Sequence, residues 1–130
     1  MSEMLVPVSP GEVVDKITIL RIKAARIKDP AKLANVQHEL ELLERIWRES
    51  RYGRTDIARE QGGLQAVNER LWDIEDRIRE KERAKSFDAP FIELARSVYI
   101  ENDERAAIKR RINLALGSTI VEEKSYAEYR

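Results

Sequence analysis

The chain has 130 residues, no cysteine, and 24 acidic residues against 24 basic ones. The length fits one domain, and the lack of cysteine excludes disulfides, thiolate metal sites and cysteine nucleophiles. A formal net charge of zero gives no field that would attract nucleic acid, so we expect no nucleic-acid partner. No stretch is long and apolar enough for a membrane span, and the N-terminal segment lacks the features of a signal peptide. We therefore expect a cytoplasmic protein with no membrane partner.

The first half of the chain predicts two long helices. Residues 9–12 (Ser-Pro-Gly-Glu) form a capping box, with Ser9 as the N-cap and proline at the first helical position. Apolar residues then recur at intervals of four and three, which is the spacing of a helical packing seam. Asp29 caps the second helix, which carries the same spacing over residues 33–47 and ends near Gly53. The short connection between these two helices predicts an antiparallel hairpin.

A third long helix is predicted from about residue 64 to residue 85. Its apolar positions follow the helical spacing, and its outer face carries acidic and basic residues four positions apart. The path of residues 53–63 stays open, because a short capped turn fits there and Gly62-Gly63 is expected to break it.

The last part of the chain predicts two shorter helices and a tail. Asp88 caps a fourth helix, and Asn102-Asp103 caps a fifth that ends at Gly117. Residues 118–130 are expected to form an extended or irregular tail that docks through its tyrosines. The expected fold class is all-α, in a single domain over residues 1–130. It is a helical bundle built on a long antiparallel hairpin, a third long helix and two shorter C-terminal helices.

Two pairs of carboxylates form the most enzyme-like pattern. Glu41 and Glu44 lie three positions apart on the second predicted helix, and Asp73 and Asp76 repeat that spacing on the third. If the pairs face each other, they can hold Mg²⁺ through oxygen ligands. The pattern is similar in part to that of all-helical nucleotide pyrophosphohydrolases, although the second pair has aspartate where that family has glutamate. The alternative is that the acids form ordinary intrahelical ion pairs with arginines four residues further on.

A second candidate site lies at the junction of the fourth and fifth predicted helices and in the tail. An anion such as phosphate would fit the start of the fifth helix, where free backbone amides and the helix dipole favour negative charge. Arg105 and Lys109 lie one turn apart and would supply the counter-charge. In the alternative, structural interpretation, helix caps occupy those amides and the acids of the tail pair with nearby arginines. The candidate ligand-binding residues are Tyr99, Asn102, Asp103, Arg105, Lys109, Glu122, Glu123, Lys124 and Tyr126.

Four segments, 9–16, 71–76, 99–112 and 122–126, resemble those of a bacterial family of short all-helical proteins, a domain of unknown function. The resemblance extends over nearly the whole chain and implies a bacterial, cytosolic origin. It transfers no reaction, ligand or catalytic residue.

Two classes of function therefore stay open. The first is a cytosolic oligomerisation or partner-binding module, with a homodimer favoured and no cofactor, because the long seams supply more apolar helix face than a thin hairpin buries. The second is a small-molecule binding protein or an enzyme acting on a phosphorylated metabolite or nucleotide. Mg²⁺ is implied only if the carboxylate pairs converge.

Overall fold

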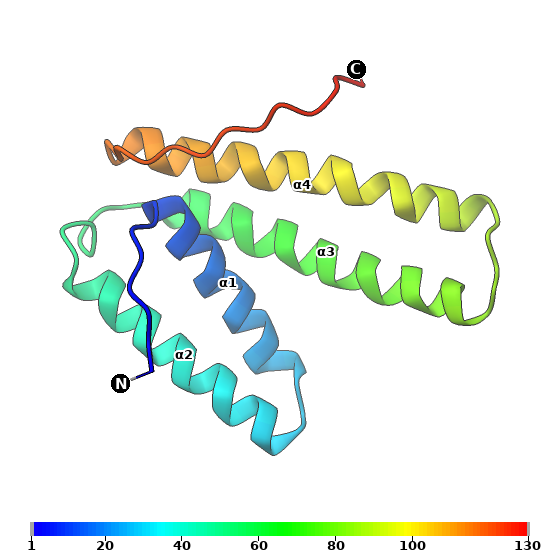
Figure 1. Ribbon diagram of the computed structural model, residues 1–130, viewed down its shortest axis with the longest axis horizontal. Helices are drawn as coiled ribbons and strands as arrows, with labels where there is room; N and C mark the ends of the chain where they lie inside the picture. Colours follow the sequence, from blue (N-terminus) through cyan, green and yellow to red (C-terminus); the bar gives the residue numbers. More distant parts are fainter. Residues whose placement is uncertain (1, 130) are drawn as a thin grey trace.

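The computed structural model describes residues 2–129 and is entirely helical in its regular structure, with no strand in that range. The all-α fold class is thereby confirmed. Residues 1 and 130, which end the predicted domain and tail, lie outside the described residues. The helices are α1 (Pro10–Arg26), α2 (Pro30–Glu49), α3 (Ala58–Arg83) and α4 (Ala89–Ala115) (Figure 1).

Local sequence signals set most of the helix ends. The side chains of Ser9, Asp29 and Asp88 each accept a hydrogen bond from the backbone N–H three residues further on, as predicted for N-caps. A proline lies in the first turn of each of these three helices. Gly117 follows the C-cap of α4 with a φ of 67°, a conformation that glycine adopts without strain.

The prediction of two shorter C-terminal helices is wrong, because α4 is continuous through Asn102 and Asp103. No glycine or proline interrupts the chain between Pro90 and Gly117, so nothing breaks the backbone hydrogen bonding. The Asp103 carboxylate does not cap a helix but accepts hydrogen bonds from the C-terminal tail. Asp103, a good capping residue in the middle of a helix, thus pairs with the tail instead, while the Asn102 side chain accepts a hydrogen bond from Arg105 one turn along α4.

The third helix begins at Ala58 rather than near residue 64, and it contains Gly62 and Gly63. A Cβ on Gly63 would lie 3.2 Å from the Cδ1 atom of Ile108, so the missing side chain permits close approach of α3 to α4. This packing offsets the roughly 1 kcal/mol by which glycine disfavours a helix interior. The expectation that Gly62-Gly63 interrupts the helical structure is therefore wrong.

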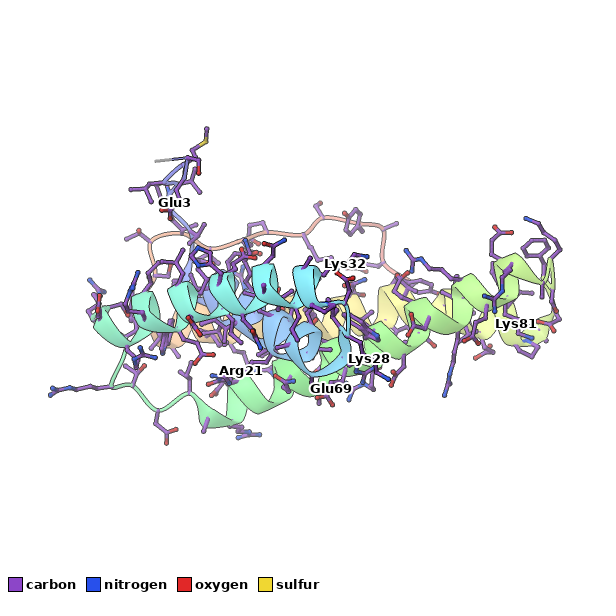
Figure 2. All side chains as sticks on the ribbon, turned by 90° about the horizontal axis from the view of Figure 1, so that it is seen from below. Glu3, Arg21, Lys28, Lys32, Glu69 and Lys81 are labelled. Carbon is purple, nitrogen blue, oxygen red and sulfur yellow. The ribbon has the colours of Figure 1, made fainter. Side chains whose placement is uncertain are left out.

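The four helices form two unequal parts (Figure 1). Helices α1 and α2 lie side by side and are joined by residues 27–29, while α3 and α4 form a longer pair that α1 crosses at one end. We call residues 74–101, where α3 and α4 extend beyond α1, the arm. Figure 2 shows the arm with Lys81 near its tip, and the N-terminal segment with Glu3 projecting away from the helices. The buried core lies at the crossing and contains Val14, Ile57, Leu64, Val67, Ile108 and Ile112.

Candidate functional site

All nine predicted ligand-binding residues line one groove. It lies between the second half of α4 and the C-terminal tail, which runs back along this helix (Figure 1), and it has a volume of about 1530 Å³. The structure therefore brings together residues that are up to 27 positions apart, from Tyr99 to Tyr126. Because α4 is continuous, no helix begins in this groove, and the free amides expected for an anion are absent from this part of the described chain.

A buried carboxylate links α1, α3 and α4 beside this groove. Asp15 of α1 is 1% exposed and accepts two hydrogen bonds from Arg105 of α4, one of them 2.9 Å from Nε. The Nδ2 atom of Asn68 donates to Asp15 and to the Thr18 hydroxyl, at 2.9 Å each. The hydrogen bond to Asp15 raises the pKa of Arg105, although burial opposes this shift. Arg105 therefore first neutralises a buried charge, a role that the anion hypothesis did not include.

Lys109 connects the N-terminus of α1 to the tail. Its Nζ atom lies 2.6 Å from an oxygen of Glu12 and 2.8 Å from an oxygen of Glu122. Glu122 also accepts a hydrogen bond of 3.1 Å from the Ser9 hydroxyl. Burial lowers the pKa of Lys109, but the two carboxylates outweigh it, so this pKa is raised. Burial raises the pKa of Glu122, but Lys109 outweighs it, so that pKa is lowered. Both groups are therefore charged at neutral pH and compensate each other.

The start of α1, which lies next to Lys109, also lacks free amides. The Gly11 N–H donates to Oδ1 of Asn113 at 2.7 Å. The N–H of Glu12 donates to the Ser9 hydroxyl, and the N–H of Val13 donates to the Ser9 carbonyl. An anion would find no backbone donor at this helix end.

The tail is attached to α4 by pairs of side chains. Arg110 forms an ion pair of 2.8 Å with Glu123, as the structural interpretation of the sequence expected. Further along, Lys124 lies 2.7 Å from Asp103, and the Tyr129 hydroxyl donates to the same carboxylate at 2.6 Å. In these contacts each basic side chain, Arg110 or Lys124, is paired with one carboxylate, Glu123 or Asp103. With six acidic and five basic residues in its lining, the groove is close to charge balance rather than strongly basic or acidic.

The four carboxylates of the predicted Mg²⁺ site do not come together. Among residues 2–129, no group of three or more histidine, aspartate and glutamate side chains could hold a metal ion. The reason is α1, which packs against both α2 and α3, while the backbones of these two helices do not approach each other. Arg21 of α1 pairs with Glu44 at 3.7 Å, and Arg26 pairs with Asp73 at 2.6 Å. The carboxylates concerned are Glu41, Glu44, Asp73 and Asp76.

The arm is a surface feature that the site predictions missed. No residue between Asn68 and Ile108 is buried, although apolar residues continue at helical spacing on both helices. Ile92 is 55% exposed and Tyr99 is 41% exposed, and with Ala95 they share one face of α4. The apolar seams that continue past residue 74 were the available sequence signal. The residues of these seams that remain only half-buried are Ile74, Ile78, Phe91, Leu94 and Val98.

The fold and these surfaces define a small all-helical protein with a charge-balanced groove and a thin projecting arm. Among the described residues, none of the helices has the length and apolar character that a membrane span requires. The chain belongs to the family of unknown function DUF6165, which matches residues 4–129. No curated protein and no solved structure matches it.

Proposed function

We propose that this protein is a self-associating helical module of the bacterial cytoplasm that acts as a homodimer, with the arms of two copies packed together. The observation that carries the proposal is the arm, in which two long helices carry apolar seams and bury no residue. Two such helical pairs placed together form a four-helix bundle, the usual way in which helical hairpins cover their half-exposed seams. The proposal involves no cofactor.

The surface area of the single chain supports a large interface. A compact monomer of 15.1 kDa is expected to expose about 7,100 Å². This chain exposes 9341 Å². The excess of about 2,200 Å² is larger than the roughly 800 Å² that each partner contributes to an interface of standard size. This surplus belongs to the whole chain, including the N-terminal segment and the tail, and the arm contributes to it with two helices that bury no residue.

The test compares two exposed apolar residues of the same helix. Ile92 lies in the arm and is 55% exposed, while Leu114 lies outside it near the end of α4 and is 60% exposed. We expect sedimentation velocity to show a wild-type dimer, and Ile92→Glu to weaken the dimer by at least about 2 kcal/mol, roughly thirty-fold in Kd. Leu114→Glu is the matched control and should leave the dimer intact. A wild-type protein that is monomeric at high micromolar concentration, or equal effects of the two variants, would refute the proposal.

A second function, the binding of a small molecule, is favoured by one observation. The groove along α4 has a volume of about 1530 Å³ and contains all nine residues singled out from the sequence. The test is a thermal-shift screen with nucleotides and sugar phosphates, with and without Mg²⁺, because a ligand at a hundred times its Kd adds about 2.7 kcal/mol of stability. Tyr126→Ala is the suitable variant, because Tyr126 is 82% exposed. Replacing Arg105 would instead disturb the fold through Asp15. A screen without a shift would exclude the ligand classes tested.

A further inference from the structure

The C-terminal tail is a separable element connected to α4 through a single tight turn. Gly117, with its φ of 67°, forms this turn, and the N–H of Ser118 donates to the carbonyl of Asn113 at 2.9 Å. This is the Schellman arrangement that commonly ends a helix. The following residues, 119–129, contain no regular secondary structure and run back along α4 (Figure 1). One turn therefore determines whether the tail lies on its own helix or extends away from it.

Contacts between polar side chains provide most of what holds the tail. No residue from 118 to 129 is buried, and no hydrogen bond joins the backbone of residues 119–129 to another backbone group in the described chain. The ion pairs Arg110–Glu123 and Lys124–Asp103 join side chains that are all at least 36% exposed. Each exposed pair of this kind contributes about 0–1 kcal/mol. The tail is also held by the Lys109–Glu122 pair, whose lysine side chain is 12% exposed, and by the Tyr129 ring, which packs edge-on against Tyr99. Because the tail buries no residue and forms no backbone pairing, we expect it to contribute less to stability than the packing of the helices.

We propose that the tail is an exchangeable strap, which docks on α4 of a second copy in the same way as it docks on its own α4. Every contact that holds it in one chain is available in identical form on another copy, so exchange replaces contacts without losing any. This inference deepens the proposed self-association and rests on it, because paired arms hold a second tail at a high effective concentration.

The charges that hold the tail also identify its partner. The groove presents an acid, Asp103, and a base, Arg110, to a lysine and a glutamate that are adjacent in the tail. The tail of a second copy carries the matching charges, Glu123 and Lys124, in an extended segment of the same length. In that position its Glu122 would again accept a hydrogen bond from a Ser9 hydroxyl. The order of charges therefore selects the tail of this chain over a peptide of uniform charge.

The experiment uses two full-length variants with reversed charges. The groove variant carries Asp103→Lys and Arg110→Glu, and the tail variant carries Glu123→Arg and Lys124→Asp. In either variant alone, the tail meets like charges on every α4 available to it. In a mixture, the groove of each variant matches the tail of the other, so both sites are restored only between chains. A chain with all four substitutions restores the match within itself and is the control for the fold.

The association of a dye-labelled copy with an unlabelled one is measured by fluorescence anisotropy. We expect the mixture to associate at least tenfold more tightly than either variant with itself. A mixture no tighter than the separate variants would overturn strap exchange, even if each variant still forms dimers through its arm. Association in the mixture alone, with each variant monomeric, would support exchange and refute the arm as the interface. The mixture of variants therefore tests strap exchange, and each variant by itself tests association through the arm.

Discussion

The crossing of α1 with α3 and α4 and the arm are built from the same helices, α3 and α4, but they differ in what lies inside. At the crossing, a third helix covers the pair, and both apolar side chains and the Asp15 network are buried. In the arm, no third helix covers the pair, and no side chain is buried. The comparison shows that an apolar seam buries its residues only where a second layer covers it. The crossing therefore holds the buried contacts that stabilise the fold, and the association that we propose would use the arm.

The largest expected effect is the loss of the buried carboxylate at the crossing. Asp15→Ala leaves the Arg105 guanidinium and the Asn68 amide without their acceptor, so we expect a loss of about 3–5 kcal/mol in the free energy of unfolding. Urea denaturation at fixed protein concentration measures it. The control in the arm is Glu93→Ala, which breaks an exposed ion pair with Arg96 and should change stability by less than about 1 kcal/mol. Equal losses in the two variants would contradict the division of roles.

The second prediction tests how closely α1 approaches α4 at the crossing. A Cβ on Gly11 would lie 2.6 Å from the Lys109 carbonyl oxygen and 2.8 Å from Oδ1 of Asn113. Because the carbonyl belongs to the backbone of α4, the helices must separate, and we expect Gly11→Ala to destabilise the fold by about 1–3 kcal/mol. Thermal unfolding followed by circular dichroism measures this. An unchanged midpoint would show that α1 is not held against α4 as described.

Helix ends of this fold were predictable where the signal is local. The caps Ser9, Asp29 and Asp88 act through backbone groups within three residues, so their neighbours in the chain suffice to identify them. The interruptions predicted at Gly62-Gly63 and at Asn102-Asp103 are wrong for the opposite reason. Packing between α3 and α4 and contacts with the tail decide these positions, and both involve residues distant in the sequence.

The sequence predicted which residues gather in the groove, but not which of their charges pair with one another. The nine predicted residues of the groove lie in two short stretches of sequence, and a helix followed by a returning tail brings them together. Which charges pair depends on the faces that converge, and Asp15 reaches Arg105 across 90 positions. A sequence signal existed in Asp15, Thr18 and Asn68, polar residues placed within the apolar stripes of their helices. Such residues indicate a buried polar network when several helices carry them.

A smaller change in stability, this time an increase, is expected at Gly62, where an added Cβ has open space around it. A Cβ on Gly62 has no neighbouring atom within 4 Å, and the residue lies inside α3. We therefore expect Gly62→Ala to stabilise the protein by about 0.5–1 kcal/mol, because alanine loses less conformational freedom on entering a helix. The same measurement as for Gly11→Ala applies. Destabilisation would mean that α3 does not begin before this glycine, as the sequence had suggested.

The smallest expected effect lies at the tip of the arm and depends on pH. Asp88 caps α4 and accepts hydrogen bonds from Lys81, from the Phe91 N–H and from Ser86, which together lower its pKa from 3.8 to about 2. A carboxyl whose pKa is lower in the folded state stabilises the fold above pH 3.8, and this contribution is lost as the pH falls toward 2.

The matching variant is Asp88→Asn, which keeps a good N-cap but removes the titrating charge. We expect wild type to be the more stable protein at pH 5 and the difference to disappear near pH 2, as measured by urea denaturation at each pH. A difference that stays constant over this range would show that the cap acts through hydrogen bonding alone. Glu122 in the tail also has a lowered pKa, so the comparison is repeated in a Glu122→Gln background, where the remaining pH-dependent difference belongs to Asp88.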